Sequence, residues 1–256
     1  MHPGKIFTLI AGKLENSWQL VQAEILFRWF LPAKSQLLPI SRESTMIFAP
    51  HQDDETLGCG GLIALKRQLG IPVKVVFLTD GHKSNIQISR EEITQIRKQE
   101  ASKALNILGV SSSEDIFFLD LPDGELQDVS NEQRLNIINQ LVQLLQSFQP
   151  GEIYVPHQKD RHCDHEAAYD LVCAAVKETK IPGQVFQYPV WLFWKMPSLL
   201  QLDLKNLGQS YKLDIKSVLE KKQRAIRVYD SQLSNLPRSF RRRFFMPWEI
   251  FFQQQN

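Results

Sequence analysis

Short apolar runs alternate with longer amphipathic segments along most of the chain. The runs are rich in β-branched and aromatic residues and predict buried strands over 45–49, 73–78, 116–119, 153–155 and 185–193. The segments between them repeat apolar residues at helical spacing and predict helices over 56–69, 89–108, 131–148 and 164–178. In the helix predicted over 89–108, Ser89 is the expected N-cap, with Glu92 at the capping-box position, and Gly109 is the expected C-cap.

Strands that alternate with helices in this way favour a parallel sheet covered on both faces. The predicted fold is α/β, a Rossmann-like three-layer sandwich with a mostly parallel sheet and an N-terminal helical extension. Ligands of such sheets bind beyond the carboxyl ends of the strands. Candidate functional residues are therefore expected directly after the strands.

Two terminal segments fall outside the alternation. Residues 1–43 predict a helical extension, with an amphipathic helix over 18–31 that Pro32 ends. Residues 44–232 form the predicted main domain. Residues 233–256 form a basic, aromatic tail, which we expect to pack on or beside that domain, with contact to an anionic membrane surface as the alternative.

Composition narrows the class of protein. The 256 residues are 43% hydrophobic and 23% charged, as in globular proteins, which excludes a wholly disordered chain. The net charge of +2 argues against a nucleic-acid partner for the chain as a whole, although residues 216–256 hold nine Lys/Arg against three Asp/Glu. Three cysteines are too few for a disulfide scaffold, and no apolar run is long enough to span a membrane. The expected location is cytoplasmic, with peripheral contact at the inner membrane surface as the alternative.

Polar clusters follow two of the predicted strands. His51, Asp53 and Asp54 follow the first strand, and His157, Asp160, His162, Asp164 and His165 follow the fourth. Four of the six histidines of the chain therefore lie directly after two strands. A lone Asp-Asp pair commonly caps a helix and a lone histidine commonly makes a structural hydrogen bond, but the two clusters together favour a functional site.

The residue types and spacing in these clusters suit a metal ion. His51 and Asp54 are three residues apart at a strand-to-helix turn, so both can reach one cation, and His165 can add a second imidazole. Two histidines and one carboxylate form a recurring ligand set for catalytic zinc, with one coordination position open. His157 is the alternative to His165.

The remaining groups then take catalytic roles. Asp53 is adjacent to a ligand and can remove a proton from the attacking water. His162 can face the same site without binding the metal, and Asp164 can hold its ring. Gly58, Gly60 and Gly61 do not fit a dinucleotide-binding motif and are interpreted as close-packing positions.

The same residues resemble a known family, the LmbE-like or PIG-L-type zinc-dependent N-deacetylases. Residues 49–55, Ala-Pro-His-Gln-Asp-Asp-Glu, and residues 162–165, His-Cys-Asp-His, match the two motifs of the family. Weaker similarities extend the match over residues 45–232. Gln52 replaces the proline of the first motif and is expected to leave that turn more mobile.

The resemblance implies a role for each matching residue. His51, Asp54 and His165 would bind Zn²⁺, with Fe²⁺ as an alternative metal, and Asp53 would be the general base. His162, protonated and oriented by Asp164, would stabilise the oxyanion. Arg97 and Asp123 would contact the sugar, the alternatives being an ion pair within the helix for Arg97 and a simple turn for Asp123.

The function implied is a hydrolase that removes the N-acetyl group from an N-acetylglucosamine-type conjugate and releases acetate. Either Asp53 or His162 can protonate the leaving amine. The alternatives are an amidase for a larger acyl group or a thiol-sugar conjugate, and a non-catalytic glycan-binding module. The expected partner is an amino-sugar conjugate, with a lipid-linked glycan suggested by the aromatic termini, and an oligomer is compatible with the sequence.

Overall fold

The computed structural model describes residues 21–22, 24–85, 87–194, 207–234 and 236–253. Their strands form an eight-stranded sheet in the order β1-β7-β8-β6-β5-β2-β3-β4. The N-terminal part of the predicted helix over 18–31 lies outside the described residues. None of the helices in the described ranges has the length and apolar character needed to cross a bilayer.

The central strands follow the sequence prediction closely. Four neighbouring strands pair in parallel with β2 near their centre, namely β2 (Thr45–Ala49), β3 (Val73–Thr79), β4 (Ile116–Leu121) and β5 (Glu152–Pro156). The next strand, β6 (Gln184–Tyr188), pairs in parallel with β5. It ends before residue 193, the predicted end, because the chain turns at residues 190–192 to bind Asp160.

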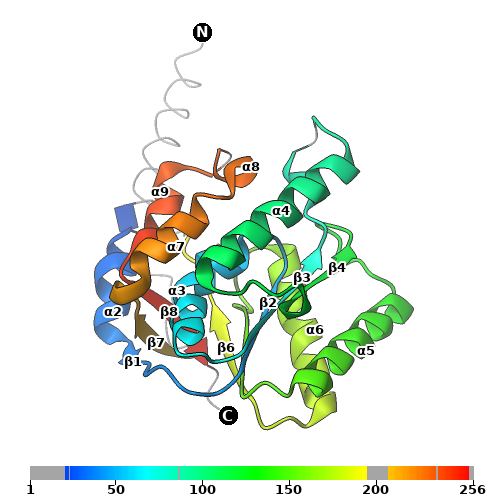
Figure 1. The fold of residues 1–256 in the computed structure, drawn as a ribbon, viewed down its shortest axis with the longest axis horizontal. Coiled ribbons are helices and arrows are strands. Elements are labelled where there is room, and N and C mark those ends of the chain that lie inside the picture. Colours follow the sequence, from blue (N-terminus) through cyan, green and yellow to red (C-terminus); the bar gives the residue numbers. More distant parts are fainter. Residues whose placement is uncertain (1–20, 23, 86, 195–206, 235, 254–256) are drawn as a thin grey trace, which may run out of the picture.

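Helices cover both faces of the sheet (Figure 1). One face packs against α3 (Asp54–Gln68), α4 (Arg90–Leu108) and α7 (Leu219–Ile226), and the other against α5 (Asn131–Phe148) and α6 (Cys163–Thr179). The period-two alternation of β2 explains this division. Ile47 and Ala49 face the first layer, and Met46 and Phe48 face the second. This arrangement confirms the predicted α/β fold with its mostly parallel sheet.

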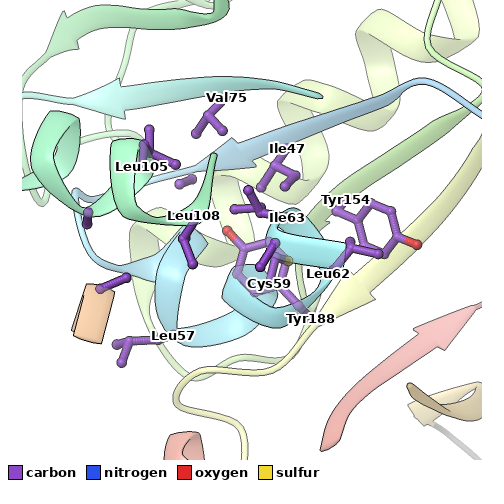
Figure 2. Packing of buried hydrophobic residues seen from close by; sticks show 14 of the residues in the cluster. Ile47, Leu57, Cys59, Leu62, Ile63, Val75, Leu105, Leu108, Tyr154 and Tyr188 are labelled. Atoms are coloured by element: carbon purple, nitrogen blue, oxygen red, sulfur yellow. The ribbon is translucent and has the colours of Figure 1, made fainter. Parts of the chain in front are cut away.

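The core under α3 is packed at close range (Figure 2). A Cβ on Gly58 would lie 2.3 Å from the Tyr188 ring, and a Cβ on Gly61 would lie 2.5 Å from Ile215. No side chain fits at either distance, so these glycines let the helix approach the sheet, as the sequence suggested. The close approach places the start of α3 at the carboxyl end of β2.

The C-terminal segment supplies a strand of its own. β8 (Trp248–Gln253) lies between β6 and β7 (Gln209–Asp214) and pairs antiparallel with both. The sequence-based prediction of a tail beside the domain did not foresee this strand. The short α8 (Asp230–Leu233) and α9 (Arg238–Arg241) connect α7 to it.

The helical structure of the N-terminal extension also differs from the prediction, in that it continues past Pro32. The helix does not end there, because a π turn over Leu26–Phe30 leads directly into α2 (Leu31–Lys34), which has the proline in its first turn. Proline has no backbone N–H to donate to the preceding turn, and the π turn directly before it is where regular α-helical bonding is interrupted. A short edge strand, β1 (Gln36–Leu37), follows and pairs with β7.

Candidate active site

The two polar clusters meet at the carboxyl end of the sheet, between β2 and β5. From β2 the chain proceeds to β3 and β4 on one side, and from β5 to β6 on the other. A reversal of this kind leaves a crevice between the two strands, where ligands of α/β sheets bind. The loop after β2 carries His51 and Asp53, and Asp54 begins α3, while α6 brings His165 from the other side.

Two imidazoles converge on one carboxylate oxygen. Oδ2 of Asp54 lies 3.1 Å from Nδ1 of His51 and 3.1 Å from Nε2 of His165. All three residues are buried, with exposed fractions of 8% for His51, 2% for Asp54 and 0% for His165. The structure therefore brings together the three residues that the sequence proposed as ligands.

The two separations at Asp54 Oδ2 suit neighbouring ligands of one metal ion. Zinc bonds of 2.0–2.2 Å in tetrahedral geometry place neighbouring donor atoms about 3.3 Å apart, close to the separations at Asp54. Nε2 of His165 is buried and, despite its short distance to Asp54, makes no hydrogen bond of proper geometry to any described residue. A metal ligand is one of the few roles that satisfies a buried imidazole nitrogen of this kind. His51, His162 and His165 also place one nitrogen each within 4.8 Å of one another.

The carboxylates and imidazoles of the cluster shift one another's pKa values. Burial opposes ionisation of Asp54, but the two imidazoles hold its pKa well below the usual range. Burial likewise opposes protonation of His165, yet Asp54 and Asp160 raise its pKa to about 9. Two imidazoles that attract protons around one carboxylate form a site that favours positive charge, and a divalent cation supplies that charge.

Each of the two candidate ligand histidines also contacts a carboxylate through its other ring nitrogen. Nδ1 of His165 lies 2.7 Å from Oδ2 of Asp160, and Nε2 of His51 lies 3.1 Å from both Asp164 Oδ2 and Asp123 Oδ1. Carboxylates in this position fix the ring orientation and tautomer of metal-binding histidines. Sequence reasoning gave no role to Asp160, whose only signal was its place in the cluster after β5.

Asp160 is fully buried and binds more than the histidine. Its carboxylate accepts hydrogen bonds from the backbone N–H groups of Val190, Trp191 and Leu192 at 2.8–3.2 Å. One side chain therefore fixes both His165 and the loop after β6.

Replacing Asp160 with asparagine tests this role. The amide keeps the size of the side chain but removes the negative charge beside His165. We expect zinc affinity to fall about 10–100-fold, the range for outer partners of metal ligands. Competition with a chromogenic chelator measures it, and an unchanged affinity would show that Asp160 supports only the loop.

The role predicted for Asp164 needs correction. Its carboxylate does not hold His162 but accepts from the backbone N–H groups of Gly124 at 2.6 Å and Leu126 at 3.1 Å, besides its contact with His51. The backbone N–H of Asp164 binds His162 instead, at Nδ1 and 3.3 Å. The His-x-Asp-His spacing could not reveal this, because His162 precedes α6 while the Asp164 side chain turns toward the loop after β4.

His162 also differs in its charge. Burial, with the neighbouring His165 and His51, lowers the pKa of His162 to about 4, so the ring is neutral near pH 7 rather than protonated as expected. Because Nδ1 accepts a hydrogen bond, the proton of the neutral ring is assigned to Nε2. A neutral His162 is thus a hydrogen-bond donor without a net charge.

Asp53 is held in an unusual backbone conformation. Its φ of 149° and ψ of −28° lie in a region that residues with a side chain rarely adopt. Its N–H donates to Glu55 at 3.1 Å, and its carbonyl accepts from Thr56 at 3.1 Å and Leu57 at 2.8 Å. These bonds hold the turn so that Asp53 lines the cavity beside Asp54.

The pKa of Asp53 suits a proton acceptor. Burial raises it to about 7, although the Arg97 cation opposes the shift. Nη2 of Arg97 lies 3.3 Å from Asp53 Oδ1 and also donates to the Gln52 carbonyl at 2.8 Å. Arg97 therefore pairs with Asp53 and not within its own helix, which was the alternative considered from the sequence. It lines the cavity and positions Asp53.

Gln52, the departure from the family motif, makes a tertiary contact that the sequence did not predict. Its side chain is fully buried, and its amide donates to the Thr79 carbonyl at 2.7 Å. This bond ties the turn to the end of β3, so glutamine restricts the loop by a tertiary contact where proline restricts it by its ring.

Two further candidates from the sequence are Asp123, which lies at the cavity, and His157, which does not line it. Asp123 lines the cavity and binds His51 and, at 2.8 Å, the backbone N–H of Lys83, so it does more than form a turn. His157 faces away from the cluster. Its Nε2 bonds the Leu207 carbonyl at 3.1 Å and its Nδ1 accepts from the backbone N–H of Lys159 at 3.0 Å. This bonding argues against His157 as the alternative ligand.

Comparison with known proteins agrees with this site. The model of the family described as "PIG-L: GlcNAc-PI de-N-acetylase" matches residues 46–176, just over half of the chain. The chain belongs to the PIG-L family. The matched range contains the whole His/Asp cluster.

Individual proteins match a longer part of the chain than the family model does. The chain is 28% identical over 204 residues to a diacetylchitobiose deacetylase of Thermococcus kodakarensis, covering 74% of this chain and 70% of that protein. It is 26% identical to a probable N-acetyl-alpha-D-glucosaminyl L-malate deacetylase 2 of Bacillus subtilis, covering 77% and 86%. The crystal structure of the conserved protein TT1542 from Thermus thermophilus superposes with a TM-score of 0.63 at 27% identity, over 83% of this chain and 95% of that one.

Proposed function

We propose that this protein is a zinc-dependent N-deacetylase that hydrolyses the acetamido group of an N-acetylglucosamine-type conjugate and releases acetate and a free amine. The observation that carries the proposal is the convergence of His51 and His165 on Asp54, with Asp53 beside them at the cavity. The relatives that act on N-acetylated amino sugars support the substrate class.

His51, Asp54 and His165 would hold the metal through Nδ1, Oδ2 and Nε2. A bound divalent zinc ion polarises a carbonyl and lowers the pKa of water toward 7. The chemistry fits the donor set, because two neutral imidazoles and one carboxylate leave a coordination position free. Fe²⁺ accepts the same donors and is the alternative metal.

Asp53 would act as the base that takes the proton of the attacking water. With a pKa near 7 it exchanges a proton readily at neutral pH, so the same carboxyl can then deliver that proton to the leaving amine. His162, neutral near pH 7, is the weaker candidate for that delivery. Its Nε2–H would instead donate a hydrogen bond to the oxyanion, a type of contact worth about 3 kcal/mol.

The cavity supports a small acyl group. Its volume is about 250 Å³, below the roughly 300–1,000 Å³ of pockets that hold drug-sized ligands. Because the sugar ring would occupy part of the same cavity, the remaining space favours an acetyl group over the larger acyl groups of the alternative amidase. A non-catalytic glycan-binding module would have no need for a base beside the metal ligands, and Asp53 is present.

The decisive experiment combines metal analysis with a screen for acetate release over N-acetylated sugars. We expect acetate from an N-acetylglucosamine conjugate, loss of activity with a chelator and recovery with zinc. Zinc-loaded protein that releases no acetate from any N-acetylated sugar would refute the proposal. A cytoplasmic location, membrane contact and a lipid-linked substrate remain predictions.

Replacing Arg97 with glutamine separates its two proposed roles. Without the cation the pKa of Asp53 rises, so the acidic limb of the pH profile for kcat should move to higher pH. A change in KM alone, with an unmoved limb, would instead indicate the sugar contact that the sequence suggested.

A further inference from the structure

Part of the cavity lining, called the wall below, is apolar and aromatic. It is formed by Leu57, Val190, Trp191, Leu236 and Phe240, whereas charged and polar groups line the rest. Of these five residues only Leu57 lies in the range that the family model matches. Most of the wall lies outside the matched range, in the loop after β6 and the segment around α9.

Trp191 is held as a fixed surface within this wall. Its ring stacks on Phe240 with centroids 4.4 Å apart and an interplanar angle of 28°. Phe240 is fully buried and carries the Arg243 guanidinium 4.8 Å from its centroid. The backbone N–H of Trp191 donates to Asp160 Oδ2 at 3.0 Å. Ring and backbone are thus fixed independently.

The same ring lies next to the reacting groups. The centroid of Trp191 is 6.3 Å from that of His162, with the rings 31° apart. Asp160 Oδ2, which holds the loop of Trp191, also binds His165 Nδ1 at 2.7 Å. One oxygen atom therefore sets the position of the aromatic surface relative to the proposed metal ligand.

We infer that Trp191, supported by Phe240, is a stacking surface for the pyranose ring that carries the acetamido group. A gluco-configured pyranose has axial C–H groups on its faces and hydroxyls around its rim. A cavity lined by both aromatic and polar side chains matches that division, and aromatic rings bury apolar surface well. The substrate class is then a cyclic N-acetylated sugar rather than an acyclic N-acetylated amine. This inference rests on the proposed function.

Two substitutions at Trp191 test it. Trp191→Leu keeps an apolar side chain but removes the aromatic face, and Trp191→Phe keeps a ring. With methyl N-acetylglucosaminide and zinc-loaded protein, we expect Trp191→Leu to raise KM about tenfold with kcat and zinc content nearly unchanged. Trp191→Phe should stay within about threefold of the wild-type KM. Trp29→Leu, at a tryptophan that is 71% exposed on the N-terminal extension, is the matched control and should change nothing.

Titration calorimetry measures the affinity for the same glycoside without requiring that the protein hydrolyse it. Weakened binding by Trp191→Leu but not by Trp191→Phe or Trp29→Leu supports the stacking surface even if no acetate is released, in which case only the deacetylase proposal fails. Wild-type KM and binding in Trp191→Leu would overturn the stacking role. Equal losses in both Trp191 variants, accompanied by loss of zinc, would also overturn it, because they would assign the ring to packing alone.

Discussion

Replacing Asp53 with asparagine is expected to lower kcat by about 10²–10⁴-fold while the protein keeps its metal. The amide has the size of the carboxylate and its oxygen can still accept from Arg97, so the strained turn should be preserved. The side chain can no longer take a proton from water. Acetate release and zinc content, measured on the same preparation, test the expectation.

A matched control is available outside the cavity. Asp120 is an exposed carboxylate that pairs with Lys98 at 2.6 Å, and its φ of 53° is one that asparagine tolerates well. Asp120→Asn should retain wild-type activity. Full activity in Asp53→Asn would exclude Asp53 as the base, and loss of zinc in that variant would reassign it to the metal site.

Replacing His165 with glutamine is expected to abolish stoichiometric zinc binding. In the proposed site His165 would supply one of three donor atoms, and its buried Nε2 makes no hydrogen bond within the described residues. Its loss should weaken the metal more than the roughly 10–100-fold expected for an outer partner such as Asp160. Dialysis against chelator followed by zinc titration measures the change.

His157 provides the comparison for this variant. Both histidines are fully buried, but His157 bonds backbone groups of Leu207 and Lys159. His157→Gln should therefore keep zinc wherever it folds, as judged by its melting transition. Loss of zinc from His157→Gln with retention in His165→Gln would transfer the ligand role to His157.

Much of the fold could be predicted because its signals are local. The runs at 45–49 and 73–78 are continuous apolar segments, and α4 begins at the Ser89 cap, which accepts from the Glu92 N–H at 3.1 Å, and ends at Gly109. The strands β7 and β8 are different. They pair with each other across distant parts of the chain, and β8 lies in a basic, aromatic segment whose pattern also suits a surface tail.

The candidate site likewise has parts that the sequence predicted and parts that it did not. Residue types and strand ends predicted that His51 and Asp54 lie near His157 or His165, and the family resemblance favoured His165. The outer contacts were not predictable, because Asp160 binds a loop 30 residues away and Asp164 binds the loop after β4. Such contacts depend on the directions of side chains in the folded protein, which spacing along the sequence does not encode.

The central claim is that His51, Asp54 and His165 hold one metal ion. Crystals of the protein grown with zinc, measured at the zinc absorption edge, test it most directly. The account predicts one anomalous peak about 2.0–2.2 Å from His51 Nδ1, Asp54 Oδ2 and His165 Nε2. A peak held instead by His51 Nε2, Asp123 and Asp164, or no peak at the cluster, would contradict it.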